Sequence, residues 1–554
     1  MRNSSAPLAR RRLTTKTLVQ TVISFHPTRE MLTRSTGVAG RVHTLPPQRI
    51  SLFYIVVFLF LPHLKTKAMK CASFLLALCL SVSLIAQPER NPKIPFEKYK
   101  AAVRAELDKK FPVYRQVAKD IWRYAELGFL ETQSAARLMN VLTAEGFSLK
   151  TGVAGMPTAF EATFGSAGPV IGILAEFDAL PGLSQDSTAE RKIIQEGGAG
   201  HACGHHLFGT ASVAAAIALK NWLSANKIAG TIKLFGTPAE EGGSAKVYMV
   251  RDGLFKGVDA VLHWHPANDN DASPESCLAI KQTIFRFYGR SAHAAAAPDK
   301  GRSALDGLEA MNYMVNLMRE HVPQEARIHY VINKGGLAAN VIPDYAEAEY
   351  MVRHPDARMV EEIWKRIVKA AEGAAAGTET SMKYEIISGS YNLVPNETLA
   401  RLMYGNLQQV GGVIYTPEEV AFAKKIQSSL TFAAPPLETA ALVQPFRTGS
   451  FFPASTDVGD ITWVVPTAGM GVATWVPGVP AHSWQAVACG GMSIGFKAMN
   501  NASKVLAMTG IDLFTNPALL AKAKKELADY VGTGFVYQPL LGDRQPPLDF
   551  RKGK

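Results

Sequence analysis

Residues suited to metal binding are concentrated near the middle of this 554-residue sequence. Segment 200–206 reads Gly-His-Ala-Cys-Gly-His-His, which places three histidines and Cys203 within six residues. Thiolate and imidazole groups are ligands for zinc and similar ions. The segment also begins a predicted helix, and a helix N-terminus favours the thiolate form of a cysteine. A metal-free reactive thiol, or histidines that cap the helix, would produce the same pattern.

Three further segments carry side chains suited to the same chemistry. Glu240 and Glu241 follow an expected strand, where adjacent carboxylates point in different directions, so one can bind metal while the other acts on water. His263 and His265 end the next strand, and His482 precedes a long helix. Each segment alone is weak evidence, because an acidic pair can be a solvated loop and a single histidine is more often structural. Their combination supplies several candidate ligands and a base.

The surrounding sequence predicts an α/β fold that brings these segments together. Apolar runs alternate with helical patterns, which indicates a mostly parallel sheet with helices on both faces. Ligands bind beyond the carboxyl ends of strands in such sheets, so we expect the four segments to meet at one edge. The expected strands are 169–180, 231–236 and 258–265, and the expected helices are 96–110, 113–127, 204–225, 245–254 and 484–506.

A second domain is predicted within the first. The order β-α-β-β-α-β from about residue 277 is that of a ferredoxin-like unit, which we interpret as an inserted lid and dimerisation domain over 277–394. The catalytic, metal-binding domain then comprises 96–276 and 395–535, followed by a tail at 536–554, and 414–450 is expected to be a loop insertion. The expected lid strands are 280–288, 327–333, 346–353 and 382–388, and its helices are 303–320 and 357–375.

The charge is distributed unevenly, which bears on the possible partners. The chain has a net charge of +12, but residues 1–68 carry +10 of it, so the remainder is nearly neutral. That balance argues against a nucleic-acid-binding function. We interpret 1–68 as a spurious upstream extension or a disordered basic leader, although an uncleaved anchor would also fit.

Residues 69–86 have the pattern of a signal peptide, with Met69 and Lys70 before an apolar run. The mature protein is therefore expected to be periplasmic or secreted, without a stable membrane span, and cytoplasmic if the signal is unused. Beyond this segment the cysteines are Cys203, Cys277 and Cys489, which do not form a disulfide framework.

Taken in order, these motifs resemble the aminoacylase/carboxypeptidase superfamily of metallohydrolases, in the branch where cysteine replaces the bridging carboxylate. The resemblance covers about 96–535. It is carried by segments 176–185 (Glu-Phe-Asp-Ala-Leu-Pro-Gly-Leu-Ser-Gln), 201–206, 238–243, 259–266, 302–306, 335–343, 455–460 (Ser-Thr-Asp-Val-Gly-Asp) and 482–485.

The resemblance implies a di-metal amidohydrolase with two divalent ions, zinc or manganese. It assigns Glu240 as the general base. Two departures from the family pattern are His206, where relatives carry Asp or Asn, and Glu176, where the carboxylate-bridged branch has a ligand histidine. The first is expected to change the surroundings of the ligands, and the second fits the cysteine branch. The implied ligands are Cys203, His205, Glu241, His265 and His482.

The resemblance also implies roles for the lid. His293 matches a histidine that stabilises the oxyanion in the site of a neighbouring protomer, and Asn340 and Arg353 match residues that hold the substrate. The chain is thus expected to form a homodimer or a heterodimer through the lid domain. The implied reaction is cleavage of a small N-acyl amino acid, most specifically p-aminobenzoyl-glutamate, a step of folate catabolism. Three alternatives remain: a dipeptidase, a general N-acyl-amino-acid hydrolase, and a chain that is active only with a partner chain.

Overall fold

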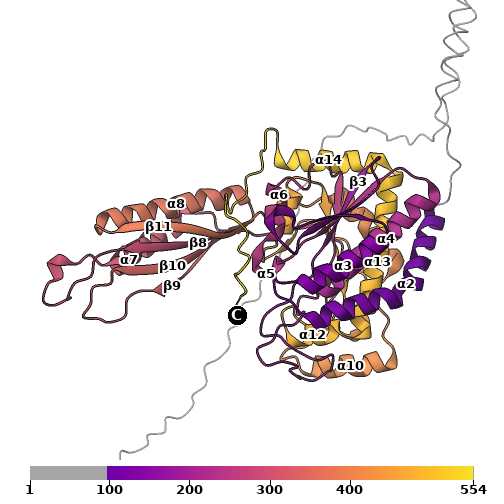
Figure 1. Ribbon diagram of the computed structural model, residues 1–554, viewed down its shortest axis with the longest axis horizontal. Coiled ribbons are helices and arrows are strands. Elements are labelled where there is room, and N and C mark those ends of the chain that lie inside the picture. The colour runs from indigo at the N-terminus through magenta and orange to yellow at the C-terminus, as the bar shows by residue number, and fades with distance from the viewer. Residues whose placement is uncertain (1–95, 553–554) are drawn as a thin grey trace, which may run out of the picture. The chain divides into compact units, whose positions relative to one another are not determined.

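The computed structural model describes residues 96–552, so the expectations for the leader and the signal peptide lie outside the described residues. The larger domain is built on a six-stranded sheet covered by helices (Figure 1). Its strands are β1 (Ser148–Thr151), β2 (Phe160–Phe164), β3 (Val170–Ala175), β4 (Thr231–Gly236), β5 (Ala260–Leu262) and β13 (Thr467–Ala468). Its helices are α2 (Phe96–Tyr124), α3 (Thr132–Ala144), α4 (His205–Asn226), α5 (Glu240–Gly243), α6 (Ala245–Arg251), α9 (Glu397–Val410), α10 (Pro417–Ser428), α11 (Val458–Thr462), α12 (Trp484–Gly490), α13 (Ser493–Thr515) and α14 (Pro517–Val531).

The sheet has the order β1-β2-β4-β3-β5-β13. Its β4, β3, β5 and β13 strands run parallel, and β1 and β2 join one edge as antiparallel strands. Two short parallel pairs extend the domain: β6 (His265–Ala267) with β14 (Gly471–Ala473), and β7 (Glu275–Cys277) with β12 (Ser450–Phe452). The α/β class with a mostly parallel sheet is therefore confirmed.

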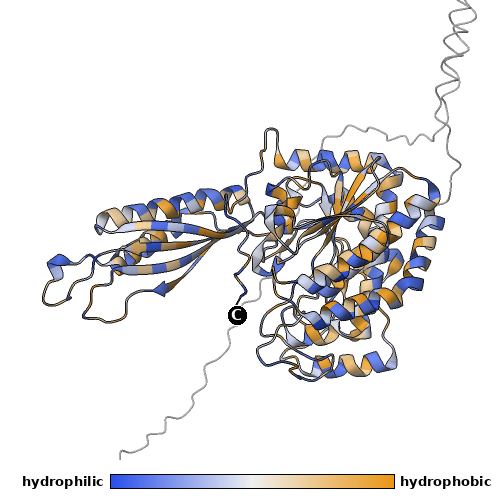
Figure 2. Ribbon diagram, viewed as in Figure 1, coloured by the Kyte–Doolittle hydropathy of each residue, from blue (hydrophilic) through white to orange (hydrophobic). Residues whose placement is uncertain are grey.

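Helix α4 forms the centre of the core because its side chains are small. Its run of alanines is buried on nearly all sides, which allows α4 to pack closely against β3, α2 and α13. The strands of the sheet are also largely hydrophobic (Figure 2), as expected for strands covered on both faces. This packing fixes the N-terminus of α4, where segment 200–206 lies.

The inserted lid domain has the expected ferredoxin-like topology. Its elements are β8 (Ala279–Tyr288), α7 (Ala304–Met318), β9 (Arg327–Lys334), β10 (Tyr345–His354), α8 (Ala357–Gly377) and β11 (Ser381–Ser390). The antiparallel sheet has the order β11-β8-β10-β9. Alternate residues of β10 are buried against α7 and α8, which follows from the two-residue period of a strand.

Several boundaries differ from those predicted. One continuous helix, α2, replaces the two helices expected at 96–110 and 113–127, although Pro112 lies inside it. A proline removes one backbone hydrogen bond, but Leu107 and Val117 are buried on either side of it and hold the helix against the core. The expected strand 258–265 is divided into β5 and β6.

The other differences lie in the second half of the catalytic domain. The expected loop 414–450 contains α10, which begins with a capping box between Thr416 and Glu419 and has Pro417 in its first turn. The expected helix 484–506 is interrupted after α12 and continues to Thr515 as α13. Within 96–552, no helix combines the length and apolar character needed to cross a membrane.

Candidate active site

The candidate metal cluster lies where α4 begins. Gly204 caps this helix with φ 78°, and a Cβ on it would lie 2.7 Å from the Pro266 side chain. Glycine is therefore required both for the backbone angle and for the close approach. That approach places Cys203 Sγ 3.5 Å from His265 Nε2.

Three groups of ligand-type side chains form here, each with its ligand atoms within 4.8 Å of one another. One contains Cys203 with His205 and His265, and a second contains Cys203 with Glu241 and His482. The third contains His205, Glu176 and Glu240. The structure thus brings together all five side chains expected to be ligands, which span residues 203–482, and places Glu240 beside them. His293, Asn340 and Arg353 belong to none of these groups.

Asp178 orients two members of the cluster. Its Oδ1 is 2.8 Å from His205 Nδ1, and its Oδ2 accepts a hydrogen bond from the backbone N–H of Glu241 at 3.0 Å. A carboxylate at Nδ1 favours the tautomer with the proton on that nitrogen, which leaves Nε2 as a lone-pair ligand. Similarly, His265 Nδ1 lies 2.7 Å from the carbonyl of Pro266, so its Nε2 faces Cys203.

A buried lysine lies behind the cluster. Lys246 Nζ is 2.8 Å from Glu176 Oε1 and 2.6 Å from Asp457 Oδ1, and all three side chains are almost fully buried. Burial alone would raise the pKa of Glu176, but the charges of Lys246, His205 and His265, with the hydrogen bond from Lys246, together lower that pKa. Burial and the nearby Glu176 and Glu241 raise the pKa of Glu240 well above its ordinary value.

Several buried polar atoms of the cluster lack hydrogen bonds within the described part of the chain, which indicates that the cluster suits a cation. Glu176 Oε2, His205 Nε2 and Glu241 Oε1 are buried and have no hydrogen-bond partner among residues 96–552. His205 Nε2 lies 3.1 Å from Glu176 Oε2, and His482 Nε2 lies 3.0 Å from Glu241 Oε1; both are ion-pair distances without hydrogen-bond geometry at these buried atoms. Buried polar atoms need partners, and bound divalent cations would supply them. The mixed sulfur, nitrogen and oxygen donors suit zinc or a similar ion.

The thiol of Cys203 is buried among charged side chains that change its pKa. Burial raises the pKa of this thiol, and the neighbouring carboxylates Glu241 and Glu240 raise it further. Burial therefore outweighs the charge and hydrogen bond of His205, which lower this pKa. A bound cation would reverse this balance, because a thiol that coordinates a metal is deprotonated.

The remaining histidines of the motifs have structural contacts. His201 Nε2 lies 3.0 Å from the carbonyl of Ile121, and His206 Nε2 lies 3.1 Å from that of Gly490. His206 thus points away from the ligands, and the carboxylate that orients His205 comes from Asp178 instead. His263 packs against Gly469, where an added Cβ would meet its ring at 2.3 Å.

The lid residues have hydrogen bonds outside the cluster. His293 is exposed, and its Nδ1 accepts backbone N–H groups of Ala295 and Ala296 at 3.2 Å, so Nε2 is its remaining ring nitrogen for other partners. Asn340 is also exposed, and its carbonyl accepts the N–H of Ala294, which joins their two loops. Arg353 donates to Ser455 Oγ at 3.1 Å.

Arg286 is another lid arginine that could bind a substrate carboxylate. Its guanidinium is already paired with Glu347 at 2.9 Å and with Glu385 at 3.0 Å. Its charge is therefore balanced within the lid, which leaves Arg353 as the better candidate.

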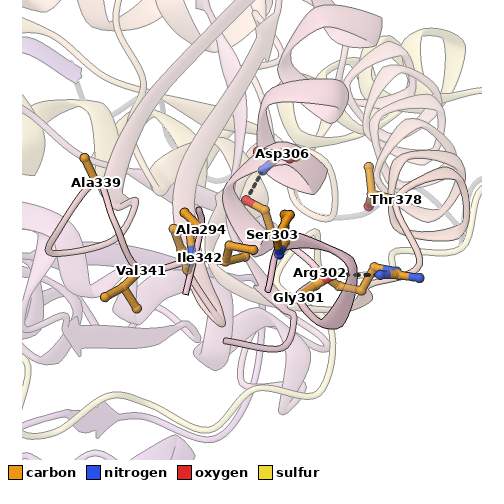
Figure 3. A pocket seen from close by; sticks show the side chains of 11 residues that line it. Ala294, Gly301, Arg302, Ser303, Asp306, Ala339, Val341, Ile342 and Thr378 are labelled. Carbon is orange, nitrogen blue, oxygen red and sulfur yellow. Dashed lines mark hydrogen bonds between the residues drawn. The ribbon is translucent and has the colours of Figure 1, made fainter. Parts of the chain in front are cut away.

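A pocket of about 390 Å³ lies beside the His293 loop (Figure 3). Ala294, Arg302, Ser303 and Val341 line it, and Ser303 Oγ accepts the N–H of Asp306 within it. All of its lining residues belong to the lid, so this pocket is separate from the candidate metal cluster.

Sequence reasoning assigned no role to Asp178, Lys246 or Asp457. Asp178 and Asp457 stood within quoted motifs, but neither had a predicted partner. The sequence does contain one indication of a role for Lys246. It is the only charged residue in the apolar run Ala-Lys-Val-Tyr-Met-Val of α6. A charge on a buried helix requires a partner, so such a lysine marks a buried ion pair.

Fold and site together define the class: a metal-dependent hydrolase with an α/β catalytic domain of the exopeptidase type and an inserted dimerisation domain. The family described as peptidase dimerisation domain matches residues 280–379. The chain is 40% identical over 453 residues to a subunit of p-aminobenzoyl-glutamate hydrolase from Escherichia coli (strain K12), covering 77% of this chain and 94% of that protein. The chain therefore belongs to the M20 family of metallopeptidases and related hydrolases.

Other similar proteins agree with this family. The Xaa-Arg dipeptidase of Mus musculus is 28% identical, over 80% of this chain and 95% of its own length. A dinuclear metal binding peptidase of the M20 family from Bacillus subtilis has a TM-score of 0.52 at 17% identity, covering 75% of this chain and 99% of that one. An aminobenzoyl-glutamate utilization protein from Klebsiella pneumoniae has a TM-score of 0.51 at 17% identity, covering 74% and 97%. These two structures support the fold.

Proposed function

We propose that this chain is a metal-dependent amidohydrolase that cleaves p-aminobenzoyl-glutamate into p-aminobenzoate and glutamate. The observation that carries the proposal is the convergence of five ligand-type side chains beside the buried carboxyl of Glu240. The 40% identity to one chain of a p-aminobenzoyl-glutamate hydrolase supports the substrate.

Two divalent cations, zinc or manganese, would be held by Cys203, His205, Glu241, His265 and His482. Cys203 belongs to two of the three candidate ligand groups, so its thiolate would be a ligand of this metal site. When bound, such ions lower the pKa of water and polarise the carbonyl to be attacked.

Glu240 is proposed as the general base. Its raised pKa makes its carboxylate a stronger proton acceptor than an ordinary glutamate. It takes a proton from water as the water oxygen bonds to the amide carbon, and it delivers that proton to the nitrogen as the carbon–nitrogen bond breaks. The products are a carboxylic acid and an amine.

The lid would complete the site of a neighbouring protomer. His293 keeps Nε2 directed away from its own loop contacts and is proposed to stabilise the oxyanion. Arg353 and Asn340 are proposed to hold the substrate carboxylate, for which a guanidinium offers two parallel hydrogen bonds. Exposed apolar side chains on α7 and β9, including Tyr313, Leu317 and Val331, support association through the lid.

The partner is proposed to be a second copy of this chain. A heterodimer is the alternative, because the p-aminobenzoyl-glutamate hydrolase of Escherichia coli (strain K12) has a second, separate chain, which is 24% identical to this one over 80% of its length. Likewise, the Xaa-Arg dipeptidase relatives support a dipeptidase as the second candidate activity.

Turnover by the purified chain alone, loaded with zinc or manganese, tests these alternatives. The panel is p-aminobenzoyl-glutamate, hippurate, a β-alanyl dipeptide and a dipeptide ending in arginine. We expect the highest kcat/KM for p-aminobenzoyl-glutamate. A preference for the arginine dipeptide would establish the second candidate instead. Activity that appears only after a second, different chain is added would establish the heterodimer.

A further inference from the structure

We propose that Arg551 is a positioning residue for the turn that carries Glu240 and Glu241, and that segment 532–552 holds it there. We name this segment the C-terminal strap. The inference rests on the proposed function, since it assigns Glu241 to metal binding.

The turn departs from helical geometry at Glu241 and Gly242. Within α5, Glu241 has φ −71° and ψ 66° and Gly242 has φ 93°, so neither residue is helical, and the flanking Ala239 and Ser244 have φ 50° and 56°. Backbone groups outside regular structure depend on other partners for a fixed direction.

Charged side chains from distant parts of the chain supply these partners. Asp178 accepts the N–H of Glu241 at 3.0 Å, and Arg551 Nη2 donates to the carbonyl of Glu241 at 2.6 Å. Both peptide groups of one residue are thereby fixed, and its side chain is directed toward Cys203 and His482. Hydrogen bonds with a charged partner are short and strong, which suits them to this purpose.

Arg551 is itself held in place. Its guanidinium lies 4.8 Å from the centre of the Phe550 ring, and Phe550 packs edge-on against Phe129 at 5.7 Å. A Cβ on Gly242 would lie 3.6 Å from the Phe550 ring, so this ring packs directly against the turn.

Earlier contacts fix the course of the strap, which runs between the two domains toward α5 (Figure 1). Tyr537 donates to Asp460 at 2.5 Å, and Tyr391 donates to the carbonyl of Gln538 at 2.8 Å. Farther along, Arg544 Nη1 donates to Glu385 of lid strand β11 at 2.5 Å. The strap is therefore attached to both domains before it reaches the turn.

We expect Arg551 to affect metal binding and not substrate binding. Without Arg551, the Glu241 carbonyl loses its charged partner, and the Glu241 side chain samples more orientations relative to Cys203. Partners that orient metal ligands typically contribute about 10- to 100-fold in metal affinity or activity. The proposed substrate contacts lie on the lid, so KM should change little.

The experiment compares Arg551→Ala, Arg551→Lys and, as the matched control, Lys552→Ala in the full-length protein. Zinc and manganese affinities are measured without substrate by competition with a chelator, and kcat and KM are measured on p-aminobenzoyl-glutamate. We expect Arg551→Ala to weaken metal binding or lower kcat by about 10-fold or more, with KM and the thermal midpoint of the metal-free protein nearly unchanged. Arg551→Lys should recover part of the loss, and Lys552→Ala should match the wild type.

Two truncated proteins test the strap further. A chain that ends after Phe550 should behave as Arg551→Ala does, and a chain that ends after Arg551 should behave as the wild type does. Equal metal affinity and kcat for Arg551→Ala and Lys552→Ala would overturn the proposal. Failure of the proposed function is distinguishable, because an inactive wild type would still show whether Arg551 affects metal affinity.

Discussion

Replacing Asp178 by Asn tests how the site orients its ligands. The substitution keeps the shape of the side chain but removes its charge and one of its two acceptor oxygens. Asp178 accepts from both His205 Nδ1 and the N–H of Glu241, at 2.8 and 3.0 Å. Asparagine can accept only one of these bonds, so its amide N–H must face the other partner.

The size of the effect follows from which bond is lost. If the amide faces His205, it donates to Nδ1 and moves the ring proton to Nε2, the nitrogen required for a cation. If it faces Glu241, two N–H groups oppose each other at the turn. A hydrogen bond to a charged group contributes about 1.5–3 kcal/mol. At about 1.4 kcal/mol per factor of ten, this corresponds to a loss of about 10- to 100-fold in metal affinity.

Chelator competition on the purified Asp178→Asn variant measures this loss for zinc and manganese. Asp186→Asn is the control, because Asp186 is an aspartate that pairs with Lys192 away from the candidate ligands. Circular dichroism of both metal-free variants establishes that the fold is retained. If Asp178→Asn binds metal as tightly as Asp186→Asn, the orienting role of Asp178 is refuted.

Three further predictions concern the base, the lid and the pH dependence of stability. Glu240→Gln should lower kcat about 100-fold or more while metal content stays near normal; loss of metal would make Glu240 a ligand instead. Mixing His293→Ala and Glu240→Gln chains, each inactive alone, should restore activity toward half of wild type per mixed dimer, whereas mixed dimers without activity would exclude a role for His293 in the partner's site. Burial raises the pKa of Asp460 to about 7 from 3.8, so the folded state retains a proton that the unfolded state releases, and stability should fall as pH rises from 4 to 7. In urea unfolding of the metal-free protein, the wild type should lose on the order of 4 kcal/mol relative to Asp460→Asn across this range, and a constant difference would contradict the assignment.

The expected ligands could be found from sequence because their signals are local. Cys203 and His205 are close together in one motif, and Glu241 and His265 each follow an apolar strand. Strand ends of a parallel sheet meet at one edge, so the strands predict that these segments meet, and the family resemblance selects Glu241 and His265 within them. His482 was different, since its place depended on the family resemblance and on a backbone with φ 59° that no local pattern indicates.

Element boundaries were less predictable where tertiary contacts override local preference. Pro112 is a helix breaker in isolation, but the buried side chains on both sides keep α2 continuous. Conversely, the prolines at 435–436 favour a loop, but the capping box at Thr416 identifies the start of α10 earlier in the same segment.

The partners that hold the ligands could not be predicted, because each joins segments that are distant in sequence. Lys246 contacts Asp457 across 211 positions, and Arg551 contacts Glu241 across 310. No periodic pattern specifies such pairs. A buried lysine in α6 signals only that some carboxylate must be near it.

The buried charges explain why these distant partners matter. Lys246 pairs directly with two carboxylates, Glu176 and Asp457, whereas Asp178, Glu240 and Glu241 also surround the ligand atoms. Unpaired buried charge is strongly unfavourable, and the raised pKa of Glu240 is its direct consequence. Two divalent cations would balance this excess, so metal binding and folding should be linked. The cluster therefore owes its affinity for cations to the excess of buried carboxylates, which is unfavourable when no metal is bound.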